Sequence, residues 1–162
     1  MIRVVRALYV TALGLWVGGM ATLAFIVAPT LFRTNRPVAG QLFGAILRAF
    51  GPLQLALGAV AVLTTLVLVK AGEVKGRPAL TRLGVLGLML VLVCVSQFYV
   101  GPAIERERDL IPNFDAIPSG VPAKARFDSL HRWSVRLAGV TLVAGVGLLA
   151  LSAAGSKTPD GA

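Results

Sequence analysis

The sequence has very little of the chemistry that enzymes and metal proteins usually need. It contains one cysteine, Cys94, and one histidine, His131. A single cysteine excludes an intrachain disulfide and the common cysteine-pair metal motifs, and a single histidine cannot supply both axial ligands of a haem. No nucleophile is paired with a base, and there is no phosphate-binding loop and no zinc motif. We therefore expect no enzyme and no catalytic residue.

Charged residues are also scarce. Only 14% of the 162 residues are charged, while 56% are hydrophobic and the mean hydropathy is +0.81. Ordinary globular domains are about 45–50% apolar, so a soluble core cannot bury this much apolar surface. The composition predicts an all-α integral membrane protein, a four-helix bundle without a water-soluble domain.

Long runs without charge mark four membrane spans, because a helix needs about 20 apolar residues to cross the hydrocarbon. The predicted spans cover residues 7–32, 49–69, 83–104 and 137–154 of a single domain, 1–154, and residues 155–162 form a polar tail. The first run resembles a signal peptide in its small residues but is too long for one. Apolar residues on one face of Val38 to Phe50 predict a short interfacial helix before the second span.

Two segments of the chain are similar to each other. Phe25 to Arg33 and Phe98 to Arg106 share Phe, Val, a small residue, Pro, an aliphatic residue and Arg in the same frame. Hydrophobicity does not dictate the positions of Pro and Arg, so the match favours two tandem helical-hairpin repeats that enter the membrane in the same direction. Pro29 and Pro102 then lie near the ends of the odd spans, where proline most simply ends a helix.

Basic residues outnumber acidic ones, and the formal net charge is +9. They flank the apolar runs and form no stripe interleaved with aromatic residues, which favours anionic lipid over nucleic acid as a partner. The face with both termini and the second connection carries seven Lys and Arg residues, and the opposite face carries nine. Because charge beside the first helix usually dominates, we predict a cell-membrane protein with both termini cytoplasmic.

Small residues in the first span form a GxxxG pattern at Gly14 and Gly18. Membrane helices associate through such close contacts, so we predict helix packing within the bundle there, with a homodimer seam as the alternative. Trp16, deep in the same span, is predicted to be a core residue.

Polar side chains predict a ligand or partner face at one membrane surface. Its six members are Arg33, Arg48, Arg106, Asp128, His131 and Arg132. Asp128 precedes His131 by one helical turn, where a carboxylate can orient an imidazole for metal binding or proton transfer. His131 could also join Met20, Met89 or Cys94 in a soft site suited to copper(I).

Two functional hypotheses follow. The first is a non-enzymatic subunit or a protein that handles small solutes or lipids, without a cofactor, whose polar face contacts an anionic lipid, a solute or another membrane protein. The second is a copper-handling, other metal-handling or redox membrane protein that uses His131.

Two short motifs carry a family resemblance. Leu15 to Gly19 with Pro29, and Phe127 to Arg132, resemble the bacterial relatives of eukaryotic transmembrane protein 205, a family of unknown function. The resemblance runs from the first to the fourth span and implies a four-helix membrane domain, and the eukaryotic members are associated with platinum-drug resistance. A fainter similarity to copper-resistance protein D, whose members are linked to copper uptake, implies the metal alternative, but this chain has one His and few Met.

Overall fold

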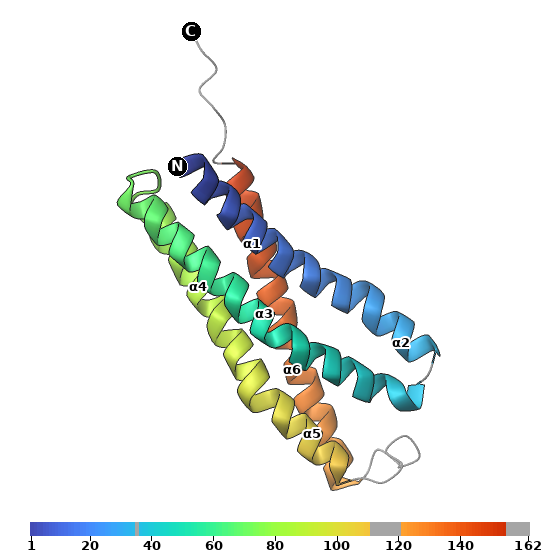
Figure 1. Cartoon of the computed structure of the whole chain (residues 1–162). Helices are drawn as coiled ribbons and strands as arrows, with labels where there is room; N and C mark the ends of the chain where they lie inside the picture. The colour runs from blue at the N-terminus through green and yellow to red at the C-terminus, as the bar shows by residue number, and fades with distance from the viewer. Residues whose placement is uncertain (35, 111–120, 155–162) are drawn as a thin grey trace.

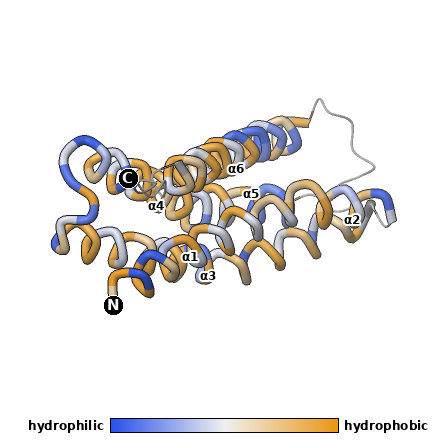
Figure 2. Tube along the Cα trace, turned by 90° about the horizontal axis from the view of Figure 1, so that it is seen from above, coloured by the Kyte–Doolittle hydropathy of each residue, from blue (hydrophilic) through white to orange (hydrophobic). Residues whose placement is uncertain are grey.

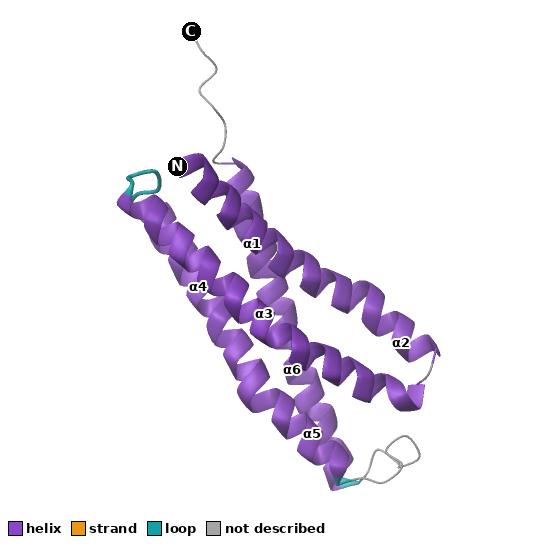
Figure 3. Cartoon of the chain, in the orientation of Figure 1, coloured by secondary structure: helices purple, strands orange, loops and turns teal. Residues whose placement is uncertain are grey.

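The computed structural model describes residues 1–34, 36–110 and 121–154, which form helices almost throughout (Figure 1 and Figure 3). The first helical rod consists of α1 (Ile2–Thr22), a five-residue π-helix η1 (Leu23–Val27) and α2 (Ala28–Thr34). The second rod is α3 (Arg36–Lys70). The third joins α4 (Arg77–Val95), η2 (Ser96–Val100) and α5 (Gly101–Asp109), and the fourth is α6 (Pro122–Ala154). The prediction of an all-α four-helix fold is confirmed.

Each rod is long and apolar enough to cross a membrane, with 32 or 33 residues. A rod of this length spans about 50 Å at about 1.5 Å per residue, whereas the hydrocarbon core is about 30 Å thick. α1 begins and α6 ends at the same end of the bundle, which we call the terminal end (Figure 1). The opposite end, residues 28–50 and 101–136, is called the polar end. The chain is thus a multi-pass membrane protein whose rods extend beyond the hydrocarbon.

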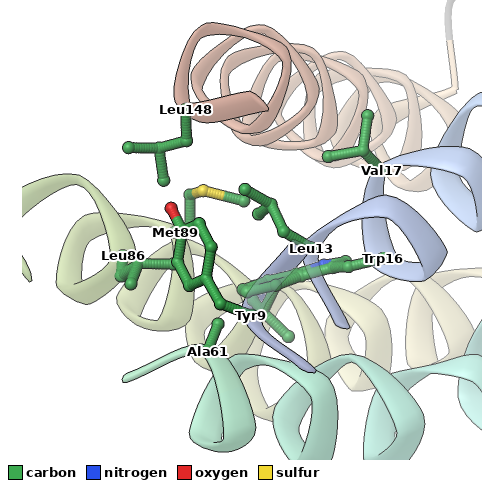
Figure 4. Packing of buried hydrophobic residues seen from close by; sticks show 9 residues of the cluster. Tyr9, Leu13, Trp16, Val17, Ala61, Leu86, Met89 and Leu148 are labelled. Carbon is green, nitrogen blue, oxygen red and sulfur yellow. The ribbon is translucent and has the colours of Figure 1, made fainter. Parts of the chain in front are cut away.

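The hydrophobic core lies where all four rods meet (Figure 4). α1 and α4 each pack against both α3 and α6. The core side chains include Tyr9, Leu13, Trp16, Ala61, Leu86, Met89 and Leu148. Trp16 is fully buried, as the sequence predicted. Many apolar side chains on the outside of the rods are exposed, which suits a protein surrounded by lipid tails.

Two glycines allow the rods to approach closely in this core. A Cβ atom at Gly58 would lie 2.9 Å from Trp16 Cζ3, and one at Gly145 would lie 2.5 Å from Val17 Cγ2. Neither the indole nor the branched valine can move aside easily, because both are packed in the core. These two positions therefore require the absence of a side chain.

The GxxxG pair does not take part in this packing. A Cβ atom at Gly14 or Gly18 would meet no described atom within 4 Å. The close intrachain contact predicted there is not found, because α1 turns Leu13, Trp16 and Val17 toward its neighbours. The homodimer seam stays a prediction.

Residues 38–50 form the first part of α3 and not a separate interfacial helix. The apolar face that suggested such a helix packs on the first rod. The rings of Phe43 and Phe32 lie edge to face with centroids 6.4 Å apart, and the Phe50 ring lies over Gly19. Tertiary contacts therefore hold this segment along the bundle, and the prediction of an interfacial helix is wrong.

Both odd rods contain a π-helical turn just before a proline. The Ala28 N–H bonds to the Leu23 carbonyl in η1, and the Gly101 N–H bonds to the Ser96 carbonyl in η2. In an α-helix a proline ring collides with the carbonyl four residues earlier, and a wider turn relieves that collision. Pro29 and Pro102 therefore do not end their helices as predicted. Their equal placement fits a duplication, which stays a hypothesis.

Candidate functional site

The polar end carries more charged side chains than the terminal end. Eight basic and four acidic side chains are described there. The basic ones are Arg33, Arg48, Arg106, Arg108, Lys124, Arg126, Arg132 and Arg136, and the acidic ones are Glu105, Glu107, Asp109 and Asp128. Figure 2 shows the hydrophilic parts of α5 and of the first part of α6. The excess of positive charge attracts anionic groups at the membrane surface.

An ion pair joins α3 to α5 at this end. Arg48 Nη1 pairs with Glu105 Oε1, and the two side chains are 58% and 39% exposed. Arg48 precedes Lys70 on the same helix by about 33 Å at 1.5 Å per residue, close to the thickness of the hydrocarbon. With Lys70 at one membrane surface, the Arg48–Glu105 pair lies among the headgroups of the other.

A second polar contact ties α3 to η2. Gln97 Nε2 donates a hydrogen bond of 3.0 Å to the Leu47 carbonyl oxygen. The Gln97 amide lies directly over Gly51, where a Cβ atom would be 2.3 Å from Gln97 Cδ. Gly51 therefore makes room for this contact.

A groove of about 250 Å³ includes one side chain from each of these two polar contacts. Its walls come from α3 and η2, and it is lined by Arg48, Gly51, Pro52, Leu55, Gln97 and Phe98. Leu55, Pro52 and Phe98 supply apolar surface, and the Phe98 side chain is largely exposed. A guanidinium above an apolar surface suits a molecule with an anionic head and an apolar chain, because a guanidinium can donate several hydrogen bonds to one phosphate.

A larger depression, of about 500 Å³, lies on the outer side of α6. It is lined by Arg136, Gly139, Val140, Val143 and Ala144, which all belong to this one helix. It has no opposing wall, so we interpret it as ordinary lipid-facing surface. The smaller groove, with two walls and two polar side chains, is the better candidate site.

Further contacts at the polar end hold α5 against α6. Arg126 Nε lies 3.4 Å from Glu107 Oε2. The guanidinium carbon of Arg108 lies 5.5 Å from the centre of the Phe127 ring, and that ring stacks on His131 with centroids 6.1 Å apart and planes 1° apart. These contacts hold the two helices against each other.

The structure distributes the predicted ligand face over several places. Arg48 lines the groove, and His131 is exposed and stacked on Phe127. Arg33 and Arg106 are exposed and form no ion pair within the described residues. Asp128 and Arg132, although four positions apart, also form none there. Of the predicted face, only Arg48 belongs to the candidate site.

Five of the six residues that line the groove, all except Arg48, were not predicted as site residues. Neither was Glu105, the ion-pair partner of Arg48. Gln97 and Phe98 lie in an apolar run, where the lone amide is the only sequence signal of a polar contact. Glu105 stands three positions before Arg108, and this spacing predicts a pair within one helix. It instead pairs with Arg48 on another rod.

No cluster of possible metal ligands among the described residues supports the metal hypothesis. No group of three His, Cys, Asp or Glu side chains that could hold a metal ion occurs among residues 1–34, 36–110 and 121–154. Met89 is fully buried in the core, and Cys94 is exposed on the outside of α4. A role of His131 in metal binding stays a prediction.

Residues 11–111, more than half of the chain, match the family described as Domain of unknown function (DUF4149). The chain belongs to this family. The DUF4149 match includes the groove residues Arg48, Gln97 and Phe98, whereas His131 and all of α6 lie outside it. No curated protein and no solved structure matches the chain. The resemblances to transmembrane protein 205 and to copper-resistance protein D stay predictions.

Proposed function

We propose that this DUF4149 protein is a non-enzymatic membrane protein that binds a phospholipid in the groove between α3 and η2. The Arg48 guanidinium binds the lipid phosphate, and Leu55 and Phe98 contact the acyl chain. The observation that supports this most is the composition of the groove, which combines one cation, one amide and an apolar wall.

The position of the groove also supports the proposal. Arg48 lies at headgroup depth if Lys70 marks the opposite membrane surface, and the apolar groove residues continue from it toward the membrane centre. A phospholipid has the same order of groups along its length. The surplus of basic side chains at the polar end adds attraction for phosphate, at about 1 kcal/mol per Lys or Arg near an anionic surface.

Native mass spectrometry of the detergent-purified full chain tests the proposal by counting phospholipids that remain bound. We expect about one tightly held phospholipid, and we expect Arg48→Ala and Phe98→Ala to lower its occupancy. Arg33→Ala removes an exposed arginine of the same polar end that forms no described ion pair, so it should leave the occupancy unchanged. Equal occupancy in the Arg48→Ala variant and the unmodified chain would reject the groove as the lipid site.

The metal-handling alternative is tested in the same preparation by elemental analysis. One copper ion per chain, lost in a His131→Ala variant, would support that alternative in place of lipid binding. Lipid occupancy that depends on Arg48 but not on His131 supports the lipid proposal, because His131 does not line the groove.

A further inference from the structure

We propose that the groove selects phospholipids whose headgroup carries an ammonium as well as a phosphate, that is, the phosphatidylethanolamine class. This inference rests on the proposed lipid binding and adds the identity of the headgroup. It comes from the Arg48–Glu105 pair, which places a carboxylate directly beside the cation of the groove.

The pairing of Arg48 decides which headgroup fits. The Arg48 guanidinium already pairs with Glu105. A lipid phosphate that binds the same guanidinium therefore competes with the Glu105 carboxylate. A purely anionic headgroup, such as that of phosphatidylglycerol, leaves the Glu105 carboxylate unpaired next to a like charge. An ethanolamine headgroup avoids this cost, because its ammonium can bind Glu105 while its phosphate binds Arg48.

Two other basic side chains at the polar end have different contacts. Arg108 lies over the Phe127 ring, and Arg126 pairs with Glu107. The cation that pairs with Glu105 in the structure is Arg48. When a phosphate binds Arg48, an ammonium on the same ligand offers the Glu105 carboxylate a new partner.

The type of ammonium also matters. An ethanolamine ammonium has three N–H donors that can bind a carboxylate, as a lysine ammonium does. The ammonium of phosphatidylcholine carries the same charge but is methylated and has no N–H donor. We therefore expect the groove to prefer phosphatidylethanolamine over both phosphatidylcholine and phosphatidylglycerol.

The apolar wall favours a lipid over a soluble headgroup as the ligand. Leu55 and Pro52 on α3 and Phe98 on η2 line the groove beside Arg48. A free phosphoethanolamine would leave this surface uncovered, so its binding would lack the acyl-chain contacts that a lipid makes.

The test is a competition among lipids with identical acyl chains. The full chain is equilibrated in detergent with equimolar phosphatidylethanolamine, phosphatidylglycerol and phosphatidylcholine, and native mass spectrometry measures the occupancy of each. We expect about threefold more phosphatidylethanolamine than either other lipid, a factor typical of one partly exposed ion pair. Millimolar phosphoethanolamine should not displace the lipid. Displacement of the bound lipid at that concentration would contradict the proposal that the groove requires a lipid.

Variants of Glu105 identify the cause of the preference. Glu105→Gln should bring the ratio of phosphatidylethanolamine to phosphatidylglycerol close to one while lipid is still bound, and Glu105→Asp should keep the preference. Glu73→Gln is the matched control, because Glu73 forms a comparable ion pair with Arg6, 2.9 Å long, at the terminal end. This control should leave the ratio unchanged.

Two kinds of failure can be told apart. A chain that binds lipid without preferring phosphatidylethanolamine, or a Glu105→Gln variant with an unchanged ratio, would overturn the headgroup selection and leave lipid binding in place. A chain that retains none of the three lipids, or whose occupancy does not depend on Arg48, would overturn the proposed function as well. The competition uses the unmodified chain, so it tests the preference for phosphatidylethanolamine even if a variant does not fold.

Discussion

At the scale of single residues, two buried side chains of the core have a polar atom with no hydrogen-bond partner in the described part of the chain. The Tyr9 hydroxyl and the Trp16 indole N–H have none within the described chain, although both residues are almost completely buried. Leaving a buried polar group unsatisfied costs about 1–3 kcal/mol. Without a partner, each of these two groups would reduce the stability of the core.

Removal of the Tyr9 hydroxyl should stabilise the protein. We expect Tyr9→Phe to raise the free energy of unfolding by about 1 kcal/mol, because the unsatisfied group disappears and the ring stays in place. The ring also keeps its contact with Arg82, whose guanidinium carbon lies 5.7 Å from its centre. Unfolding in mixed micelles of mild detergent and dodecyl sulfate measures the change. A less stable Tyr9→Phe variant would mean that the hydroxyl has a partner in the membrane-embedded protein.

Alanine substitutions at glycines should separate the packed positions from the open ones. Gly58→Ala and Gly145→Ala should each lower the free energy of unfolding by about 1–3 kcal/mol, because the new methyl group collides with core side chains. Gly18→Ala should not lower it, since that position is open and alanine favours helix by up to about 1 kcal/mol. The same unfolding titration compares the three variants. If Gly18→Ala instead dissociates a dimer, the GxxxG pattern is an intermolecular seam.

At the scale of helical elements, the contact between α3 and η2 positions both walls of the groove. The Gln97 amide that binds the Leu47 carbonyl occupies the space that a side chain at Gly51 would fill. Phe98, the next residue on η2, contributes the apolar part of the same wall. The spacing of two rods therefore determines the width of the groove.

A methyl group at this contact should disturb the groove. We expect Gly51→Ala to break the Gln97–Leu47 hydrogen bond, to lower the free energy of unfolding by about 1–2 kcal/mol and to reduce lipid occupancy. Gly44→Ala is the matched control on the same helix, because a Cβ atom there meets no described atom within 4 Å. Mass spectrometry of bound lipid together with unfolding titrations checks both. Equal behaviour of the two variants would show that the contact does not shape the groove.

The helices were more predictable than the contacts between them. Uncharged runs between basic residues indicate where helices cross a membrane, because charge is costly in hydrocarbon. The π-turns before Pro29 and Pro102 could not be predicted, since a proline in an apolar run is equally consistent with the end of a helix. Glu105 has a basic neighbour within its own helix, and only the packing of the rods shows that it pairs with Arg48.

At the scale of the whole molecule, the two ends of the bundle differ in how they are held. The terminal end has one ion pair among the described residues, between Arg6 and Glu73, while the polar end has two and several ring contacts. Lys and Arg residues occur at both ends, so their distribution favours neither end strongly as cytoplasmic. The first span decides our prediction, because its flanking charges usually dominate.

Labelling of single cysteines tests the orientation. In a Cys94→Ser background, we expect Lys75→Cys, near the terminal end, to be protected from a membrane-impermeant maleimide in intact cells. Arg126→Cys, at the polar end, should be labelled. Disruption of the membrane should make both sites reactive. The opposite pattern would place the terminal end outside and reverse the predicted topology.

The length of the rods has a consequence for the choice of bilayer. Rods of about 50 Å exceed the hydrocarbon thickness, and membranes of different lipid composition differ in thickness by several ångströms. In a thick bilayer the Arg48–Glu105 pair is submerged in a medium of low dielectric constant, where opposite charges attract more strongly. In a thin bilayer the same pair is hydrated and exchanges partners more easily. The acyl chain length of the surrounding lipids would thus tune how readily the groove releases its ligand.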